Sequence, residues 1–478
     1  MPKTSRRWLQ PRVGPDQLYR LAPRPPVPER LGLHRGWHWA RRLLRSWIAW
    51  AFLAFLLSEL GYPISAIPVA FVSLFLYLAS PQFHPAAYAI DPDFEPGSPE
   101  FLTTMGSITA APFLEGNSVR IYNNGDEFYP VMIHAIESAQ YSITMEQYIF
   151  WKGQVGRRFA EAFASRARAG VHVKLLVDAI GSATLGEENI RILEAGGVQL
   201  AWYHPIRWYT LTRANRRTHR KSIIIDGRIA FTGGAGLADH WLGSARDASE
   251  WRDMMIRVEG SAAAVQQAGF AQNWLVTTGE ILTGAEYFPV PQRAGPVRVQ
   301  TILSSPTEGA GAAATMYMLA LESARRSLWI ANPYFIPSGA FIDLLGRAKR
   351  RGVEIKLMVA GRHNDTWWAR QNSVRLYGPL LEVGVEVYEF EPSMLHHKTM
   401  IVDGVWATIG TANFDNRSFS LNNETNLCIN DRGLVNQLEH IFEEDLKRCR
   451  RIDSEIWSNR RLWYRVQELA ASVIEDQV

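Results

Sequence analysis

Cysteine is almost absent from this chain. Only Cys428 and Cys449 occur among its 478 residues, so the sequence holds no CxxC pair and no set of cysteines that would form a disulfide framework. No Cys/His spacing is typical of a zinc site either. Cysteine usage therefore excludes a disulfide-rich scaffold, and we expect neither a metal nor another cofactor.

Basic charge is scarce outside the first 45 residues. Residues 1–45 hold eleven Lys or Arg, two acidic residues and seven prolines, whereas the rest of the chain carries a net charge of −5 within a total of +4. A nucleic-acid groove is usually basic, so we predict no nucleic-acid partner. The basic arm directly precedes an apolar stretch, which indicates a positive flank that faces anionic lipid.

The chain also lacks an uninterrupted apolar run for one straight transmembrane helix. The stretch from Trp47 to Leu78 has 32 residues and one charge, Glu59. A break at residues 58–63 divides it into pieces that are each shorter than the roughly 20 residues a spanning helix needs. We predict a membrane segment, either a hairpin of two short helices or a single tilted span; a buried pair of core helices is the third reading. We expect the cell (inner) membrane, with the catalytic part in the cytoplasm.

From about residue 120, strand-like and helix-like segments alternate and then repeat. AIESAQYSITMEQYIF (135–150) matches ALESARRSLWIANPYF (320–335), and ARAGVHVKLLV (167–177) matches AKRRGVEIKLMV (348–359). Alternation of this kind is typical of an α/β fold, and a single repeat of about 150 residues indicates a duplication. We therefore predict an α/β protein with two duplicated α/β/α halves packed about a pseudo-two-fold axis.

These patterns divide the chain into seven parts. The predicted organisation is a basic Pro-rich arm, a membrane segment, a linker, a first half, a Pro/Gly-rich linker, a second half and a C-terminal helical tail, at residues 1–46, 47–80, 81–119, 120–275, 276–296, 297–450 and 451–478.

The repeat contains the same polar motif twice. THRKSIIIDG carries His219, Lys221 and Asp226, and LHHKTMIVDG carries His396, Lys398 and Asp403 at the same mutual spacing. Both strings are strand-like, so His and Lys two residues apart project from one face. One copy would mean little, but two copies at matching places of a duplication predict one site to which each half contributes an imidazole and an ammonium.

This pair of groups suits a phosphodiester. Lysine supplies fixed positive charge for non-bridging oxygens, and histidine attacks in one protonation state and donates a proton in the other. With one histidine on each side of the phosphorus, the first attacks and the second protonates the departing alcohol. Asp226 and Asp403 are predicted to belong to the same site, although an aspartate before glycine also suits a strand-ending turn.

The motifs resemble the phospholipase D superfamily and, within it, the bacterial cardiolipin synthases. The resemblance covers about residues 120–450 and includes the string Gly410-Thr-Ala-Asn413-Phe-Asp-Asn-Arg-Ser-Phe419, together with Asn124-Gly-Asp126, Glu146-Gln-Tyr148, Asn332-Pro-Tyr-Phe335 and Trp251-Arg-Asp253. It implies phospholipase D-like halves. It also implies that Asn413 joins Lys398 in holding the phosphate and that Glu424 orients a catalytic histidine.

The first half departs from this pattern at one position. Gly236 stands where the family usually has Asn, so one phosphate donor is missing there. Glu250 and Asp253 are both candidates for the first-half counterpart of Glu424, and the sequence does not choose between them.

The resemblance implies a membrane-bound phosphatidyltransferase that makes cardiolipin from two phosphatidylglycerol molecules through a phosphohistidine. The alternatives are a phospholipase D hydrolase, a transferase to another alcohol and, less favoured, a non-catalytic membrane-tethered phospholipid-binding protein. By the family pattern His219 is the nucleophile and His396 the general acid, although the near-symmetry of the halves also permits the reverse. The expected partners are anionic phospholipid and the membrane, and no protein partner is predicted.

Overall fold

The chain is described from a computed structural model that covers residues 46–79, 94–207, 215–306 and 311–458, with 467 and 471. These residues fall into two units, an N-terminal helix pair and an α/β body. The predicted basic arm at 1–46 lies outside the described residues except for Ser46, whose side chain caps the first helix.

The predicted membrane segment forms two helices. Helix α2 (Trp47–Glu59) and helix α3 (Pro63–Ala79) are separated by a turn in which Gly61 has a φ of 85°. The Ser73 hydroxyl donates to the Trp47 carbonyl oxygen over 2.8 Å, so the two helices fold back along each other. No helix in the described part of the chain is both long and apolar enough to cross a bilayer.

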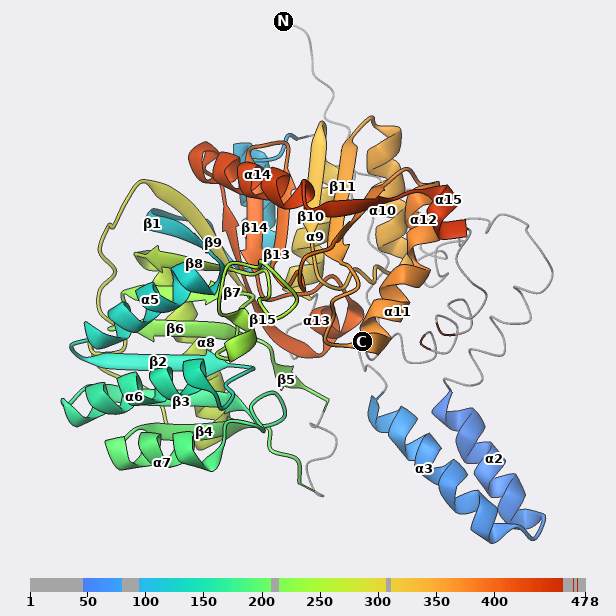
Figure 1. The fold of residues 1–478 in the computed structure, drawn as a ribbon, viewed down its shortest axis with the longest axis horizontal. Coiled ribbons are helices and arrows are strands. Elements are labelled where there is room, and N and C mark those ends of the chain that lie inside the picture. The colour runs from blue at the N-terminus through green and yellow to red at the C-terminus, as the bar shows by residue number, and fades with distance from the viewer. Residues whose placement is uncertain are drawn as a thin grey trace, which may run out of the picture. The chain divides into compact units, whose positions relative to one another are not determined.

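The first half of the body follows the predicted alternation (Figure 1). Its elements are β1 (Leu114–Asn123), α5 (Asn124–Glu137), β2 (Ser142–Gln147), α6 (Gln154–Arg168), β3 (His172–Asp178), α7 (Glu187–Gly196), β4 (Gln199–Tyr203), β5 (Arg217–Thr218), β6 (Lys221–Ile225), β7 (Ile229–Gly233), the short 3-10 helix η3 (Asp239–Trp241), β8 (Met254–Glu259) and α8 (Ser261–Thr278).

The second half repeats this order with small additions. Its elements are β9 (Val297–Ser304), α9 (Ala312–Ser323), β10 (Ser327–Ala331), α10 (Gly339–Arg350), β11 (Glu354–Ala360), α11 (Trp367–Arg375), α12 (Tyr377–Glu382), β12 (Glu386–Phe390), β13 (Lys398–Val402), β14 (Trp406–Gly410), α13 (Asn416–Ser420), β15 (Asn422–Ile429), α14 (Arg432–Leu446), β16 (Cys449–Ile452) and α15 (Ser454–Ser458). Gly170 and Gly352, predicted to end α6 and α10, have φ values of 91° and 90°, as glycines just past a helix commonly do.

One sheet of 16 strands runs through the described body, and its strand order is nearly palindromic. The order is β16-β12-β11-β10-β13-β14-β15-β9-β1-β8-β7-β6-β2-β3-β4, with β5 added beside β15. Strands β9 and β1 pair antiparallel at the middle, so the strands of one half recur in reverse order in the other. This arrangement is the one expected of two duplicated halves about an approximate two-fold axis.

Helices cover both faces of the sheet. On one face, residues of α8 and α14, including Phe270, Trp274, Leu438 and Phe442, belong to a single apolar core that also contains strand residues of both halves. On the other face of the first half, α5, α6 and α7 pack over a separate core with Phe159 and Leu193. The halves thus share a core on one face.

Part of the predicted linker at 81–119 is folded. Residues 99–108 form helix α4 (Pro99–Ile108), and β1 begins at Leu114. Phe101 of α4 is fully buried and lies edge-to-face against Trp406, with ring centroids 5.8 Å apart. The sequence did not predict this helix, because its apolar face consists of only a few residues. Of the predicted tail at 451–478, the chain forms the end of β16 and helix α15, and most of the remainder lies outside the described residues.

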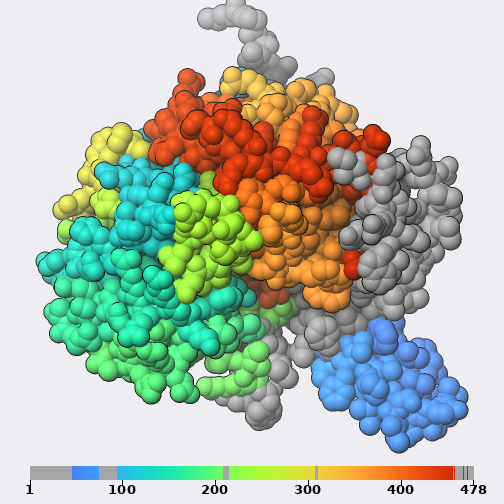
Figure 2. All heavy atoms as spheres, in the orientation of Figure 1, coloured from blue at the N-terminus to red at the C-terminus, as the bar shows by residue number. Residues whose placement is uncertain are grey.

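A buried ion pair joins the halves close to the middle of the body. The Arg252 Nε donates to both oxygens of Asp445, over 2.9 and 2.8 Å, and its other nitrogens reach the side chains of Asn123 and Asn124. Both partners of the ion pair are almost wholly buried. The segment that carries Arg252 follows β7, and Figure 2 shows it in yellow-green between the first-half and second-half surfaces.

We expect Arg252→Ala to lower the free energy of unfolding by about 3–5 kcal/mol, because it leaves the Asp445 carboxylate buried without its partner. Urea denaturation followed by circular dichroism measures this loss. Arg157→Ala is the matched control, since Arg157 makes ion pairs with Glu161 and Glu188 on the surface, and this variant should unfold with the wild type. Equal midpoints for all three proteins would contradict the prediction.

Candidate active site

The two repeated motifs place their histidines at the starts of equivalent strands. His219 and His396 each lie two residues before the lysine that begins β6 or β13. The Nζ atoms of Lys221 and Lys398 donate to the carbonyl oxygens of His219 and His396, over 2.9 and 2.5 Å. Each ammonium is therefore held beside its own imidazole, as the HxK spacing predicts.

The backbone of each histidine is hydrogen-bonded to the opposite half. The His219 N–H donates to the Asn423 carbonyl oxygen over 2.9 Å, next to the parallel pairing of β5 with β15. The His396 N–H donates to the Arg252 carbonyl oxygen over 2.8 Å, beside a parallel bridge between Arg252 and Leu395. These contacts hold both histidine segments between the halves.

Each imidazole is also oriented by a carboxylate of the opposite half. The His219 Nδ1 lies 3.0 Å from both oxygens of Glu424, and the His396 Nδ1 lies 2.8 Å from Asp253 Oδ2. Of the two first-half candidates, Asp253 occupies this place, whereas Glu250 pairs with Arg246 near the surface. An Nδ1–H given to a carboxylate leaves Nε2 free for chemistry.

The protonation states suit a nucleophilic site. Burial lowers the pKa of His219 to about 4, against the attraction of Glu424. Burial and then the charge of Lys398 and Lys221 hold the pKa of His396 well below its usual range. Burial alone would raise the pKa of Glu424, but the neighbouring His219 keeps it lowered. A neutral imidazole beside an ionised carboxylate results.

The lysines are perturbed as well. Burial, followed by repulsion from Lys398, lowers the pKa of Lys221 to about 7, and burial lowers that of Lys398 to about 8. The two neighbouring ammonium groups repel each other, and a bound phosphodiester anion would stabilise both in their charged form.

Asn413 follows β14, two residues after Thr411. Its Oδ1 is buried and accepts no hydrogen bond from the described residues. Its first-half equivalent is Gly236, so that side of the site has no amide at this position. The site is therefore asymmetric in the residues beside the lysines.

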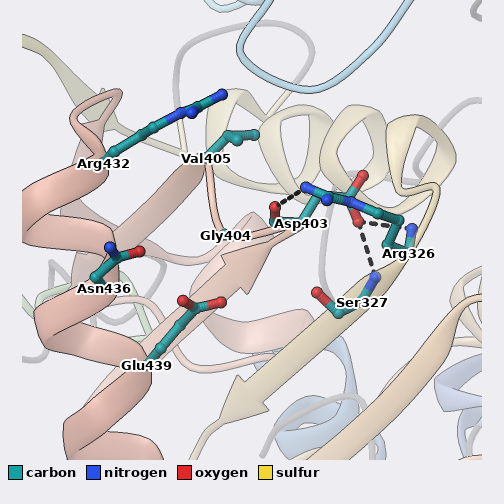
Figure 3. Close-up of a pocket in the computed structure, with 8 residues that line it drawn as sticks. All are labelled: Arg326, Ser327, Asp403, Gly404, Val405, Arg432, Asn436 and Glu439. Carbon is teal, nitrogen blue, oxygen red and sulfur yellow. Dashed lines mark hydrogen bonds between the residues drawn. The ribbon is translucent and has the colours of Figure 1, made fainter.

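Asp226 and Asp403 lie at the other end of the strands from the histidines. Asp226 accepts from the backbone N–H groups of Gln140, Tyr141 and Ser142, and Asp403 accepts from those of Arg325, Arg326 and Ser327. Five strand residues at about 3.3 Å each separate them from the lysine end. Figure 3 shows Asp403 with Arg326 and Ser327, beside an open cavity of about 470 Å³. The structure does not bring the two aspartates to the histidines; their contacts are those of a backbone clamp.

The sequence alone assigned no role to several residues that contact the histidines or their carboxylates. Tyr148 stacks edge-to-face on His219, and Trp241 and Trp251 contact the ring of His396. Thr411 donates its hydroxyl to Glu424 over 2.5 Å. Tyr148, Trp251 and Thr411 stand in strings that carry the family resemblance, which is the signal that could have marked them, whereas Trp241 stands in none. Among the described residues, no cluster of three or more His, Cys, Asp or Glu is arranged to hold a metal.

Comparison with known proteins gives one consistent match. Residues 132–274 and 317–446 match the family model described as "Cardiolipin synthase, PLD-like domain". A cardiolipin synthase of Geobacillus sp. (strain WCH70) is 35% identical over 370 residues, which cover 77% of this chain and 74% of the relative. A probable cardiolipin synthase of Bacillus subtilis (strain 168) is 32% identical over 339 residues, covering 70% of this chain and 67% of that protein.

Among solved structures, the phosphatidylserine synthase of Haemophilus influenzae Rd KW20 shares the fold. It superposes with a TM-score of 0.59 at 12% sequence identity and covers 79% of this chain and 100% of its own. At that identity the likeness concerns the fold alone.

We expect Asp403→Ala to lower the free energy of unfolding by about 1–3 kcal/mol, because backbone N–H groups lose their acceptor. Activity per folded molecule should stay within about twofold of wild type if the clamp is structural. Thermal unfolding and an activity assay on the same preparation measure both. Asp403→Asn, which keeps an acceptor oxygen and tolerates the positive φ, should lose less stability. A large loss of activity in a fully folded Asp403→Ala protein would place this aspartate in the chemistry.

The lysines predict an alkaline limit to activity. Above the pKa values of about 7 for Lys221 and about 8 for Lys398, the free site loses positive charge and binds a phosphodiester less well. We expect kcat/KM to fall by about tenfold per pH unit above that range, since kcat/KM reports the free enzyme. Lys221→Arg keeps its charge at these pH values and should move the limit upward. A flat kcat/KM up to pH 10 would contradict the assignment.

Proposed function

Because the chain belongs to the family of PLD-like cardiolipin synthases, we propose that it is a phosphatidyltransferase that makes cardiolipin from two phosphatidylglycerol molecules with release of glycerol. The observation that carries this proposal is the meeting of two His/Lys pairs in one site, where each imidazole is oriented by a carboxylate of the opposite half. Two imidazoles allow one to attack and the other to transfer the proton.

In the first step, His219 attacks the phosphorus of one phosphatidylglycerol. Glu424 accepts the Nδ1–H, so Nε2 carries the lone pair that forms the nitrogen–phosphorus bond. The bond from phosphorus to the glycerol headgroup oxygen breaks, and His396 gives a proton to that oxygen. The anionic phosphodiester raises the proton affinity of His396, which the lysines lower in the free site. Glycerol leaves, and the phosphatidyl group stays on His219.

In the second step, the headgroup hydroxyl of another phosphatidylglycerol attacks the phosphohistidine. Its proton passes to Nε2 of His396, the nitrogen–phosphorus bond breaks, and cardiolipin leaves. His396 then holds the proton that it gave away in the first step. Lys221, Lys398 and Asn413 stabilise the charge on the non-bridging oxygens. The low pKa of Glu424, which persists despite its burial, keeps a negative charge beside the phosphorylated imidazole.

We also propose that α2 and α3 hold the enzyme at the membrane. Their apolar side chains point outward, with Ile64 84% exposed, Leu60 69% and Phe71 67%. In the sequence, Trp47 begins α2 and the basic residues of the arm precede it, a composition that suits the lipid interface. A hairpin keeps the body on the side of the basic arm, and we place both on the cytoplasmic face of the inner membrane.

Purified full-length protein incubated with radiolabelled phosphatidylglycerol should give cardiolipin and glycerol, separated by thin-layer chromatography. We expect His219→Ala and His396→Ala each to lower the rate by about 10² to 10⁴-fold or more, because each removes one of the two groups that make and break bonds. His134→Ala is the control, since His134 is exposed on α5, and it should match the wild type.

Each product identifies a different reaction. Phosphatidic acid in place of cardiolipin would show that water, rather than a lipid hydroxyl, attacks the intermediate, and would make the enzyme a hydrolase. Unchanged lipid with the wild type would refute the proposed function.

A further inference from the structure

The first half lacks two polar side chains that directly follow β14 in the second half, Thr411 and Asn413. Strand pairings place Gly410 opposite Asn426 and Gly233 opposite Met255, so Thr411 and Asn413 correspond to Gly234 and Gly236. In the second half the Thr411 hydroxyl donates to Glu424. Neither glycine has a side chain to make the equivalent contact with Asp253.

The space beside these glycines is occupied. A Cβ atom at position 236 would lie 2.8 Å from Cζ3 of Trp241 and 2.9 Å from the Cβ of Ile149, and one at position 234 would lie 2.2 Å from Asp253 Oδ1. Trp241 is fully buried. No other residue type fits at position 236 while the indole ring keeps its place.

Trp241 makes the contacts that the glycines do not. Its Nε1–H donates over 2.9 Å to Asp253 Oδ2, the same oxygen that lies 2.8 Å from the His396 Nδ1. Its ring also packs edge-to-face against His396, with centroids 5.4 Å apart. Besides its histidine, Glu424 thus receives a threonine hydroxyl and, over 3.4 Å, the Asn422 amide, whereas Asp253 receives the indole N–H of Trp241.

We propose, on the basis of the function proposed above, that Trp241 is a positioning residue of the transfer reaction. It holds the Asp253 carboxylate against His396 so that the imidazole presents Nε2 to the leaving and entering hydroxyl groups. Because Gly234 and Gly236 have no side chains, they leave the space that this indole and the carboxylate occupy. The first half therefore has no asparagine at position 236. Trp241 occupies the space there and acts through His396.

The charges around Asp253 set the pH at which it takes up a proton, and a loss of packing alone would not change that pH. Burial raises the pKa of Asp253, and the hydrogen bond from Trp241 is among the contacts that lower it. The titratable groups that act on this carboxylate or on its histidine are Lys221, Lys398, His219, His240, His396 and His397. Without the indole donor, Asp253 takes up a proton at higher pH and stops orienting His396.

The test compares Trp241→Phe with Trp251→Phe in the full-length enzyme on phosphatidylglycerol. Both tryptophans contact the ring of His396, but only the Trp241 indole is seen to donate to Asp253 among the described contacts. We expect Trp241→Phe to lower kcat by about 10- to 100-fold, as loss of a hydrogen bond to a charged group does, with KM changed less than twofold. The acidic limb of its kcat–pH profile should move to higher pH, and that of Trp251→Phe should stay in place.

A second comparison covers the case of a variant that folds poorly. Trp241→Met fills the same space with a flexible apolar chain and should show the same displaced limb. Gly236→Ala should cost more stability in the wild type than in Trp241→Ala, where only the contact with Ile149 remains, as thermal unfolding would measure. An active wild type whose Trp241→Phe and Trp241→Met variants keep its kcat and pH profile would overturn the positioning role. An inactive wild type would instead overturn the proposed function, and this inference with it.

Discussion

Neither half of the body contains both a histidine of the site and the carboxylate that orients it. Glu424 of the second half orients His219, and Asp253 of the first half orients His396. The backbone contacts that accompany these pairs, from His219 to Asn423 and from His396 to Arg252, cross in the same way. The site therefore exists only where the halves are docked, and the continuous sheet and shared core are what keep the two imidazoles in a fixed relation.

The crossed pairing of histidines with carboxylates explains why the charged groups tolerate burial. Two lysines and two histidines in one apolar surrounding would be costly if each stood alone, but each imidazole faces a carboxylate, and each ammonium is held by a backbone carbonyl oxygen. What remains are the neighbouring ammonium groups of Lys221 and Lys398, which repel each other at the place where we propose that a phosphodiester binds. Burying these groups costs free energy, and this cost lowers the pKa values of the lysines and histidines. A bound anion would reduce the cost.

Much of this arrangement follows from the sequence, because a duplicated HxK motif on strand-like segments leaves few ways to combine the halves. The choice between Glu250 and Asp253 did not follow, since the loop after β7 is longer than its counterpart after β14 and shifts the offset between the halves from 177 at the histidines to 171 at the carboxylates. The positions of Asp226 and Asp403 required the turn geometry, in which a positive φ aims each carboxylate at backbone N–H groups. Trp241 carries no motif, and only the three-dimensional contact with Asp253 distinguishes it from a core residue.

The crossed pairs also bear on how such a chain could arise. A single half with its own histidine and carboxylate would have a working site only as a homodimer, in which every substitution appears on both sides at once. Such a dimer could not keep an asparagine on one side and place a glycine on the other. Once two copies are joined in one chain, each side is free to vary separately, and Gly234 and Gly236 opposite Thr411 and Asn413 are a difference that a homodimer could not hold.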